Sequence, residues 1–225
     1  LDDIVQHRIR LLTQYQNEDY ARDYQSFIAA LKDKISSNPS VSEENKKALM
    51  TTVARNLFKL MAYKDEYEVA RLYSNGEFVN KLKKQFQGKY KLQFHLAPPL
   101  LAKKDAEGKL VKRAFPQWTM KLFHVLARLK FLRGSPVDIF GYSEERKMER
   151  QLIEDYKNTI SNISANLDES NYGVALVILS LPGQIRGFGH VKLGNMKKAK
   201  EKENQLLNKF HGRNQELYKV VEFSA

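Results

Sequence analysis

The chain has 225 residues, of which 42% are hydrophobic, so it can bury a core as one large domain or two small ones. It contains no cysteine, which excludes disulfides, cysteine nucleophiles, cysteine-based zinc sites and cysteine-ligated iron–sulfur clusters. Its 38 Lys and Arg against 26 Asp and Glu give a formal charge of +12. This excess favours an acidic partner, such as nucleic acid, an anionic cofactor or an acidic protein, or it reflects only a lysine-rich helical surface.

Nothing in the sequence predicts a membrane segment. The longest apolar run, Val174 to Leu179, is far shorter than the roughly 18 residues that a spanning helix needs. The first residues, Leu1-Asp2-Asp3, are acidic and unlike a secretory signal. Together with the missing cysteines, this predicts a cytoplasmic protein without membrane contact.

The first 88 residues are predicted to be helical. Apolar residues recur at steps of three and four from Ile4 to Ile35, which predicts one long amphipathic helix or two joined near Asn17. Ser40 and Glu43 form a capping box for a further helix that we expect to run to Tyr73. A shorter helix, with Phe78, Leu82 and Phe86 on one face, follows and ends at Gly88.

A small β element is predicted at about residues 89–115. Residues 90–96 alternate apolar and polar side chains, as a strand does. Pro98 and Pro99 then turn the chain. Residues 100–103 and 109–115 flank a polar tip at 104–108, a pattern that predicts a hairpin.

Residues 116–210 are again predicted to be helical. The first helix, 116–133, has apolar residues on one side, namely Trp118, Leu122, Val125, Leu126, Leu129 and Leu132. A second helix begins at Ser143, residues 167–181 read as a buried helix, and a last helix covers 191–210. With a polar tail at 211–225, the chain is predicted to be a mainly α, multi-helix single module.

Charged residues gather in the predicted helix that ends at Tyr73. Adjacent carboxylates and lysines could serve acid–base chemistry or bind a hard cation, but neighbouring helical positions point in different directions. We therefore expect Lys64, Asp65, Glu68 and Arg71 to form a structural ion-pair lattice that holds the helix in place.

The segment from Arg186 to Lys192 is the best candidate for binding an anion. Gly187 and Gly189 precede the last predicted helix, whose backbone N–H groups and dipole favour a phosphate. Arg186, His190 and Lys192 would supply donors and charge, for a coenzyme A phosphate or for contact with another domain. A purely structural turn is the alternative, because the spacing is not that of a phosphate-binding loop.

The sequence predicts neither a metal site nor catalytic residues. No two histidines have the spacing of metal ligands, and no nucleophile elbow, phosphate loop or dinucleotide fingerprint is present. Most aromatic residues fall on apolar helix faces, so nucleic-acid binding is supported by charge alone and is not expected.

Three stretches resemble a known family: ARNLFKLMAYKDEYEVARLY (54–73), FHLAPPLLAKKD (94–105) and QIRGFGHVKLGN (184–195). They resemble, in the same order, the C-terminal region of the fused bacterial indolepyruvate ferredoxin oxidoreductases, and the likeness runs from about Leu1 to Phe210. The resemblance implies a whole enzyme that oxidatively decarboxylates aryl pyruvates to acyl-coenzyme A with thiamine diphosphate, iron–sulfur clusters and coenzyme A, and that reduces ferredoxin.

This chain resembles the module that follows the catalytic regions, and it lacks their thiamine motif. The resemblance therefore implies a non-catalytic accessory or docking module that binds no cofactor itself. Its partners would be the upstream domains of the same enzyme and possibly ferredoxin, on the basic surface. Two alternatives remain: a free-standing basic helical protein that binds nucleic acid, and an independent enzyme with His190 or His95 as its base.

Overall fold

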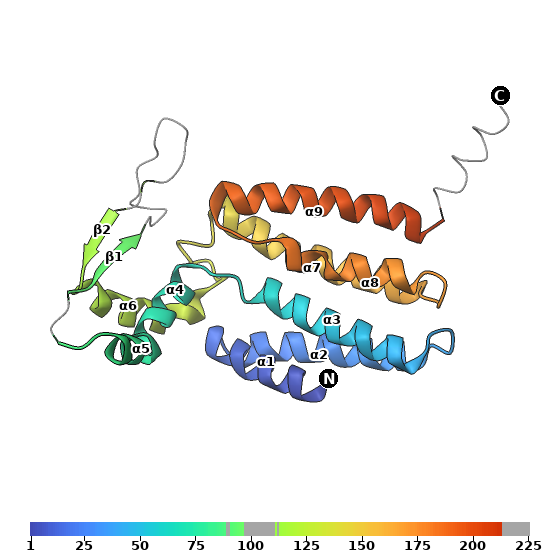
Figure 1. Ribbon diagram of the computed structural model, residues 1–225, viewed down its shortest axis with the longest axis horizontal. Coiled ribbons are helices and arrows are strands. Elements are labelled where there is room, and N and C mark those ends of the chain that lie inside the picture. Colours follow the sequence, from blue (N-terminus) through green and yellow to red (C-terminus); the bar gives the residue numbers. More distant parts are fainter. Residues whose placement is uncertain (89–90, 97–110, 112, 213–225) are drawn as a thin grey trace, which may run out of the picture. The chain divides into compact units, whose positions relative to one another are not determined.

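The computed structural model describes residues 1–88, 91–96, 111 and 113–212. These residues form nine α-helices, two short 3-10 helices and one two-stranded antiparallel sheet (Figure 1), which confirms a mainly α fold with a small β element. The sequence predicted a single module; the chain divides into two compact units. The first comprises Leu1–Thr13, Glu18–Met61 and the chain from Arg150 onward, and the second comprises Gln14–Asn17 and Ala62–Glu149.

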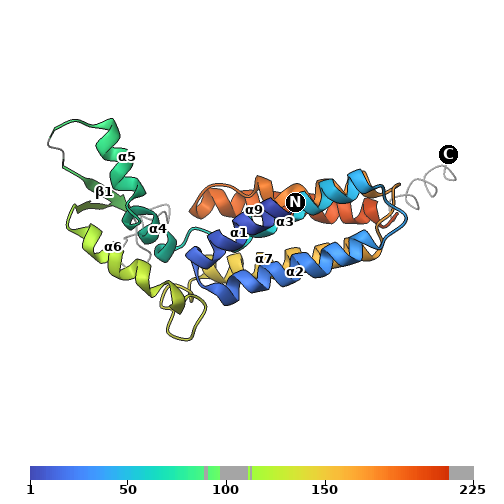
Figure 2. The same ribbon diagram turned by 90° about the horizontal axis from the view of Figure 1, so that it is seen from below.

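The first unit is a bundle of long helices that run side by side in both views (Figures 1 and 2). It is built from α1 (Asp2–Tyr15), α2 (Glu18–Ser36), α3 (Glu43–Met61), α7 (Glu144–Ala165), α8 (Tyr172–Ser180), the 3-10 helix η2 (Leu181–Gln184) and α9 (Gly189–Phe210). The N-terminal segment is thus two helices that meet near Asn17, which was one of the two predicted arrangements. The first residues of α7 and the last of α1 belong to the second unit.

The core of the bundle is formed by the apolar stripes that the spacing predicted. Its most deeply buried side chains come from five helices and include Leu12, Tyr24, Ile35, Leu49, Leu57, Ile160, Ile163, Ile178 and Leu179. Burial of such side chains stabilises the bundle by about 1.5–3 kcal/mol each.

Tyrosine hydroxyls tie the helices of the bundle together. Tyr24 of α2 donates to the carbonyl oxygen of Ala54 at 2.9 Å, and Tyr156 of α7 donates to that of Leu179 at 2.7 Å. Burial raises the pKa of Tyr24 to about 12, and burial also raises the pKa of Tyr156. Both phenols therefore remain neutral donors at physiological pH.

The second unit contains α4 (Glu66–Ser74), α5 (Glu77–Gln85), β1 (Gln93–Leu96), β2 (Arg113–Pro116), α6 (Thr119–Arg128) and the 3-10 helix η1 (Leu129–Leu132). Its core is an aromatic cluster around Tyr73 of α4. The Tyr73 ring lies 5.0 Å from Phe78, 5.3 Å from Phe94 and 5.6 Å from Phe123, so four elements meet there. A two-stranded sheet is marginal by itself, and here Phe94 anchors it to the helices.

The small β element is present where it was predicted. β2 pairs with β1, with Phe94 opposite Phe115. The predicted strand at 100–103 and its tip at 104–108 lie outside the described residues. Pro116 was expected to begin a helix, but it ends β2, and α6 begins at Thr119.

Two predicted helices are shorter than the sequence indicated. The helix expected to run to Tyr73 is broken after Met61, because Asp65 caps α4 by accepting a hydrogen bond from the Glu68 backbone N–H at 2.8 Å. The helix expected at 167–181 begins only at Tyr172, because Asp168 accepts backbone hydrogen bonds from Ser170 and Asn171 in a turn.

Within the part of the chain that is described, no helix is both long enough and apolar enough to cross a membrane.

Candidate functional site

The turn that leads into α9 has a backbone that only glycine adopts readily. Gly187 has a φ of +98° and Gly189 a φ of +52°. A Cβ on Gly187 would lie 2.8 Å from Cγ1 of Val191, so this turn packs tightly against the first turn of α9. The predicted glycine pair thus sets the position of Arg186 and of the helix start.

A cation from another helix joins this turn. Lys59, near the end of α3, donates to the carbonyl oxygens of Pro182 at 2.6 Å and Gly183 at 3.0 Å. Arg186 donates through Nε to the same Gly183 oxygen at 3.0 Å. These contacts bring together two cations that lie more than 120 positions apart in the sequence. We call Lys59, Arg186, Lys192 and the start of α9 the basic corner.

Lys59 lies in a positive environment. Burial lowers its pKa, and the charges of Arg186 and Lys192 lower it further. A lowered pKa means that the protonated form of Lys59 is destabilised by its surroundings. An anion bound nearby would stabilise that form. Lys59 and Lys192 are half-buried, whereas Arg186 is exposed.

The start of α9 adds to this positive potential. Its N-cap residue, Phe188, makes no side-chain capping hydrogen bond, and the first turn contains no acidic residue. By contrast, α1, α2 and α3 each begin with two carboxylates. A helix N-terminus carries a partial positive charge, which here is not offset by a side chain of the helix itself. Phe188 is 70% exposed and Val191 50% exposed, so the corner also presents apolar surface.

The predicted anion-binding residues all lie in the turn or the first turn of α9, but they do not all make contacts there. Arg186, Gly187, Gly189 and Lys192 share the turn and the start of α9. His190 is exposed and forms no hydrogen bond or ion pair among the described residues. Lys59 was not predicted to belong here, because no local pattern links α3 to a turn so distant in the sequence.

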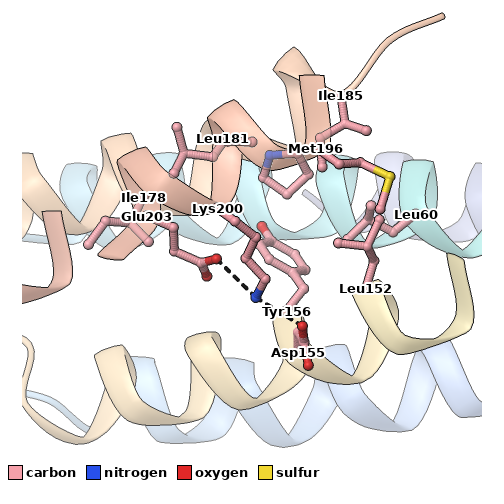
Figure 3. Close-up of a pocket in the computed structure, with 12 residues that line it drawn as sticks. Leu60, Leu152, Asp155, Tyr156, Ile178, Leu181, Ile185, Met196, Lys200 and Glu203 are labelled. Atoms are coloured by element: carbon pink, nitrogen blue, oxygen red, sulfur yellow. Dashed lines mark ion pairs between the residues drawn. The ribbon is translucent and has the colours of Figure 1, made fainter. Parts of the chain in front are cut away.

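A small cavity lies next to the basic corner in the first unit, between α3, α7, α8, η2 and α9 (Figure 3). Its volume of about 30 Å³ has room for one or two water molecules and nothing larger. Lys200 lies at its side and pairs with Asp155 at 2.9 Å and Glu203 at 3.2 Å, the pairs drawn in Figure 3. Because every charge is paired, this group is a structural tie between α7 and α9.

The predicted ion-pair lattice is correct for Glu68 and Arg71 but wrong for Asp65 and Lys64. Asp65 pairs with Arg133 of the chain after η1, at 2.5 and 2.9 Å, and Glu68 pairs with Arg71 through two contacts of 2.8 Å. Lys64 is exposed and forms no ion pair within the described residues. It lies before α4 and not on it, because Asp65 begins the new helix.

Arg133 is the centre of the buried polar network in the second unit. Its side chain is 3% exposed; it donates to the carbonyl oxygen of Tyr15 at 2.7 Å and lies 3.7 Å from the centre of the Tyr15 ring. Burial acts to lower its pKa, but the hydrogen bonds to Asp65, together with the charges of Asp65, Tyr15 and Tyr63, outweigh burial and raise it. Nearby, Tyr67 donates to Asp138 at 3.1 Å.

A second buried arginine lies between two carboxylates. Arg146 contacts Glu149, and its Nε lies 3.5 Å from Oε2 of Glu66, close enough for an ion pair but too long for a good hydrogen bond. Burial raises the pKa of Glu66, against the pull of Arg146. Both arginines hold elements of the second unit together, and neither faces an open site.

No group of three or more metal-ligating side chains is close enough to hold a metal ion among the described residues. The comparison with curated proteins gave no match, and the comparison with solved structures gave none either. Residues 1–205 match the model of the family described as "Family of unknown function (DUF6537)". The match covers most of the chain, and the protein therefore belongs to the DUF6537 family.

Proposed function

We propose that this chain is a non-catalytic accessory and docking module of a cytoplasmic indolepyruvate:ferredoxin oxidoreductase, and that its basic corner binds an acidic partner protein. The observation that carries the proposal is the convergence of Lys59 and Arg186 on one carbonyl oxygen, with Lys192 beside them. The resemblance of residues 54–73, 94–105 and 184–195 to the C-terminal region of that enzyme supplies the context.

In this proposal the upstream regions hold thiamine diphosphate, the iron–sulfur clusters and coenzyme A. This chain has no cysteine to ligate a cluster. Its part is to pack against those regions and to receive ferredoxin, an acidic protein, on its positive surface. The cations would steer association, and exposed Phe188 and Val191 would supply apolar contact.

The test is a binding titration of ferredoxin against the chain at low and physiological ionic strength. Arg186→Glu and Lys192→Glu are expected to weaken binding by about tenfold or more, because like charges then meet across the contact. Lys197→Glu changes the charge equally on an exposed position of the same helix, and we expect it to have a much smaller effect. Equal losses in all three variants would show that net charge, and not the corner, governs binding.

Two further measurements, of turnover and of DNA binding, separate the competing functions. Turnover of a 2-oxoacid by the isolated chain would refute a non-catalytic role. Salt-sensitive binding of nonspecific duplex DNA at physiological ionic strength, with no binding of ferredoxin, would instead support the nucleic-acid alternative.

A second candidate function is binding of a coenzyme A phosphate at the start of α9. The specific observation that favours it is the first turn of α9, which has no acidic residue and no side-chain cap. Coenzyme A is then expected to raise the melting temperature, and Arg186→Glu should abolish the shift. Lack of any shift at millimolar coenzyme A would eliminate this candidate.

A further inference from the structure

Helix α6 in the second unit presents an apolar stripe to solvent. Trp118, at its N-cap, is 60% exposed, Leu122 is 54% exposed and Val125 is 58% exposed. Steps of four and three residues place these side chains on one face of the helix. The sequence predicted an apolar side here; in the structure its members Trp118, Leu122 and Val125 are exposed, whereas Leu126 packs inward.

Helix α6 is well packed on its other side, so the exposure of this stripe does not come from loose packing of the helix. The opposite side of α6 is bound to the unit's core: Phe123 is 7% exposed, and Met120, Leu126 and Ala127 pack against the aromatic cluster. The helix is thus apolar on two faces, only one of which is buried within the unit. Exposed large apolar side chains that adjoin on one face, with a tryptophan among them, are typical of a protein-binding surface.

Charge indicates what kind of partner fits this face. The sequence of α6, TMKLFHVLAR, contains no acidic residue. Lys121 and Arg128 are both exposed, and because they are seven residues apart they lie on the same edge of the stripe. A second copy of this chain would bring two such cationic edges together on molecules of formal charge +12, which is unfavourable.

We propose that the outer face of α6 docks an amphipathic helix of a partner protein, with apolar residues against Trp118, Leu122 and Val125 and carboxylates against Lys121 and Arg128. This surface is in a different unit from the basic corner and shares no residue with it. The inference therefore goes beyond the proposed function and can be tested separately from it.

Trp118 is the only tryptophan of the chain, so its fluorescence reports on this face alone. The probe is a synthetic helical peptide of about 18 residues with leucines at i, i+3, i+4 and i+7 and glutamates along the flanks. Titration of the whole chain with this peptide is expected to shift the Trp118 emission to shorter wavelengths, in a saturable way, and to protect it from iodide quenching. The same peptide with lysines in place of the glutamates should bind about tenfold more weakly.

Two matched variants locate the contact. Val125→Asp places a carboxylate in the stripe and should weaken peptide binding by about tenfold or more. Val137→Asp makes the same change at a position of the same unit that is 63% exposed but outside α6, and should leave binding unchanged. Circular dichroism confirms that both variants remain folded, as expected for exposed positions.

Several outcomes would overturn the inference. One is the absence of an emission shift with the acidic peptide, and another is equal binding of the acidic and basic peptides. A concentration-dependent dimer that Val125→Asp dissociates would show that a second copy covers the face. A Trp118 shift with anionic vesicles or single-stranded DNA, but not with the peptide, would assign the face to those ligands instead.

Discussion

Lys59 and Arg186 donate hydrogen bonds to the same acceptor, the carbonyl oxygen of Gly183, at 3.0 Å each. A carbonyl oxygen has two lone pairs, so both donors can be satisfied, but the arrangement holds two positive charges close together without a carboxylate between them. The hydrogen bonds of Lys59 hold η2 against α3, although Lys59 and Arg186 repel each other.

Replacing Lys59 by Met tests this balance. The carbonyl oxygens of Pro182 and Gly183 lose a charged donor, which costs about 1–3 kcal/mol, while repulsion from Arg186 and Lys192 is relieved. We expect a net loss of about 1 kcal/mol in the free energy of unfolding, measured with urea. Added salt should stabilise the wild type more than this variant, because it screens the repulsion. The control, exposed Lys47→Met on the same helix, should stay within about 0.5 kcal/mol.

The buried pair of Asp65 and Arg133 gives a larger effect. Asp65→Asn or Arg133→Met alone leaves a buried charge without its partner and should cost about 3–5 kcal/mol. The double variant should cost clearly less than the two single losses together, and urea unfolding of all four proteins measures the coupling. Additive losses would mean that the two side chains act independently. Lys64→Ala, at the exposed position next to Asp65, should be nearly neutral.

Replacing two glycines by alanine should have opposite effects on stability, because Gly187 has a positive φ and a close neighbour and Gly194 has neither. Gly187→Ala introduces a Cβ at a φ of +98° and 2.8 Å from Val191, so we expect a loss of about 1–2 kcal/mol. Gly194→Ala, within α9 and with open space around its Cβ, should stabilise the protein by about 0.5–1 kcal/mol. Thermal unfolding measures both. A stabilising Gly187→Ala would show that the turn before α9 differs from the one described.

Tyr24 makes stability depend on alkaline pH. Its pKa is about 12 in the fold against 10.0 when unfolded, so its contribution is complete below pH 10 and is lost as the pH rises through 12. The full loss in the free energy of unfolding is about 2.7 kcal/mol, because the pKa differs by about two units between the folded and unfolded chain. Tyr24→Phe should be about 1 kcal/mol less stable at pH 8, since the bond to Ala54 is gone, yet more stable than the wild type at pH 12. Parallel curves for the two proteins between pH 9 and 12 would contradict this assignment.

Local signals in the sequence were sufficient for most of the fold. Apolar spacing located the bundle helices, and alternation located β1, because both patterns reflect which side chains are buried. The break before α4 had a signal that the expectation of one continuous helix overlooked: Asp65 followed by Glu68 has the spacing of a capping box. The pairing of β2 with β1 could not be found in this way, since no local pattern selects the partner of a strand.

The candidate sites were predictable only in part. The turn from Arg186 to Lys192 carries its own glycine pattern, whereas Lys59 joins it through a contact across 124 positions with Gly183. Arg133 was likewise not expected as the partner of Asp65, 68 residues earlier. The outward direction of Trp118, Leu122 and Val125 depends on which side of α6 the aromatic core occupies. Periodicity predicts that a helix has an apolar face but not whether its own fold covers that face.

The aromatic cluster around Tyr73 also bears on the order of folding. Its four rings belong to α4, α5, β1 and α6, which lie up to 50 positions apart, and none of these short elements is long enough to persist alone in water. Each element therefore gains its stability from rings supplied by the others. The second unit should consequently form in one concerted step, late enough for β1 and α6 to have met, and hydrogen exchange of its amides should report a common free energy of opening.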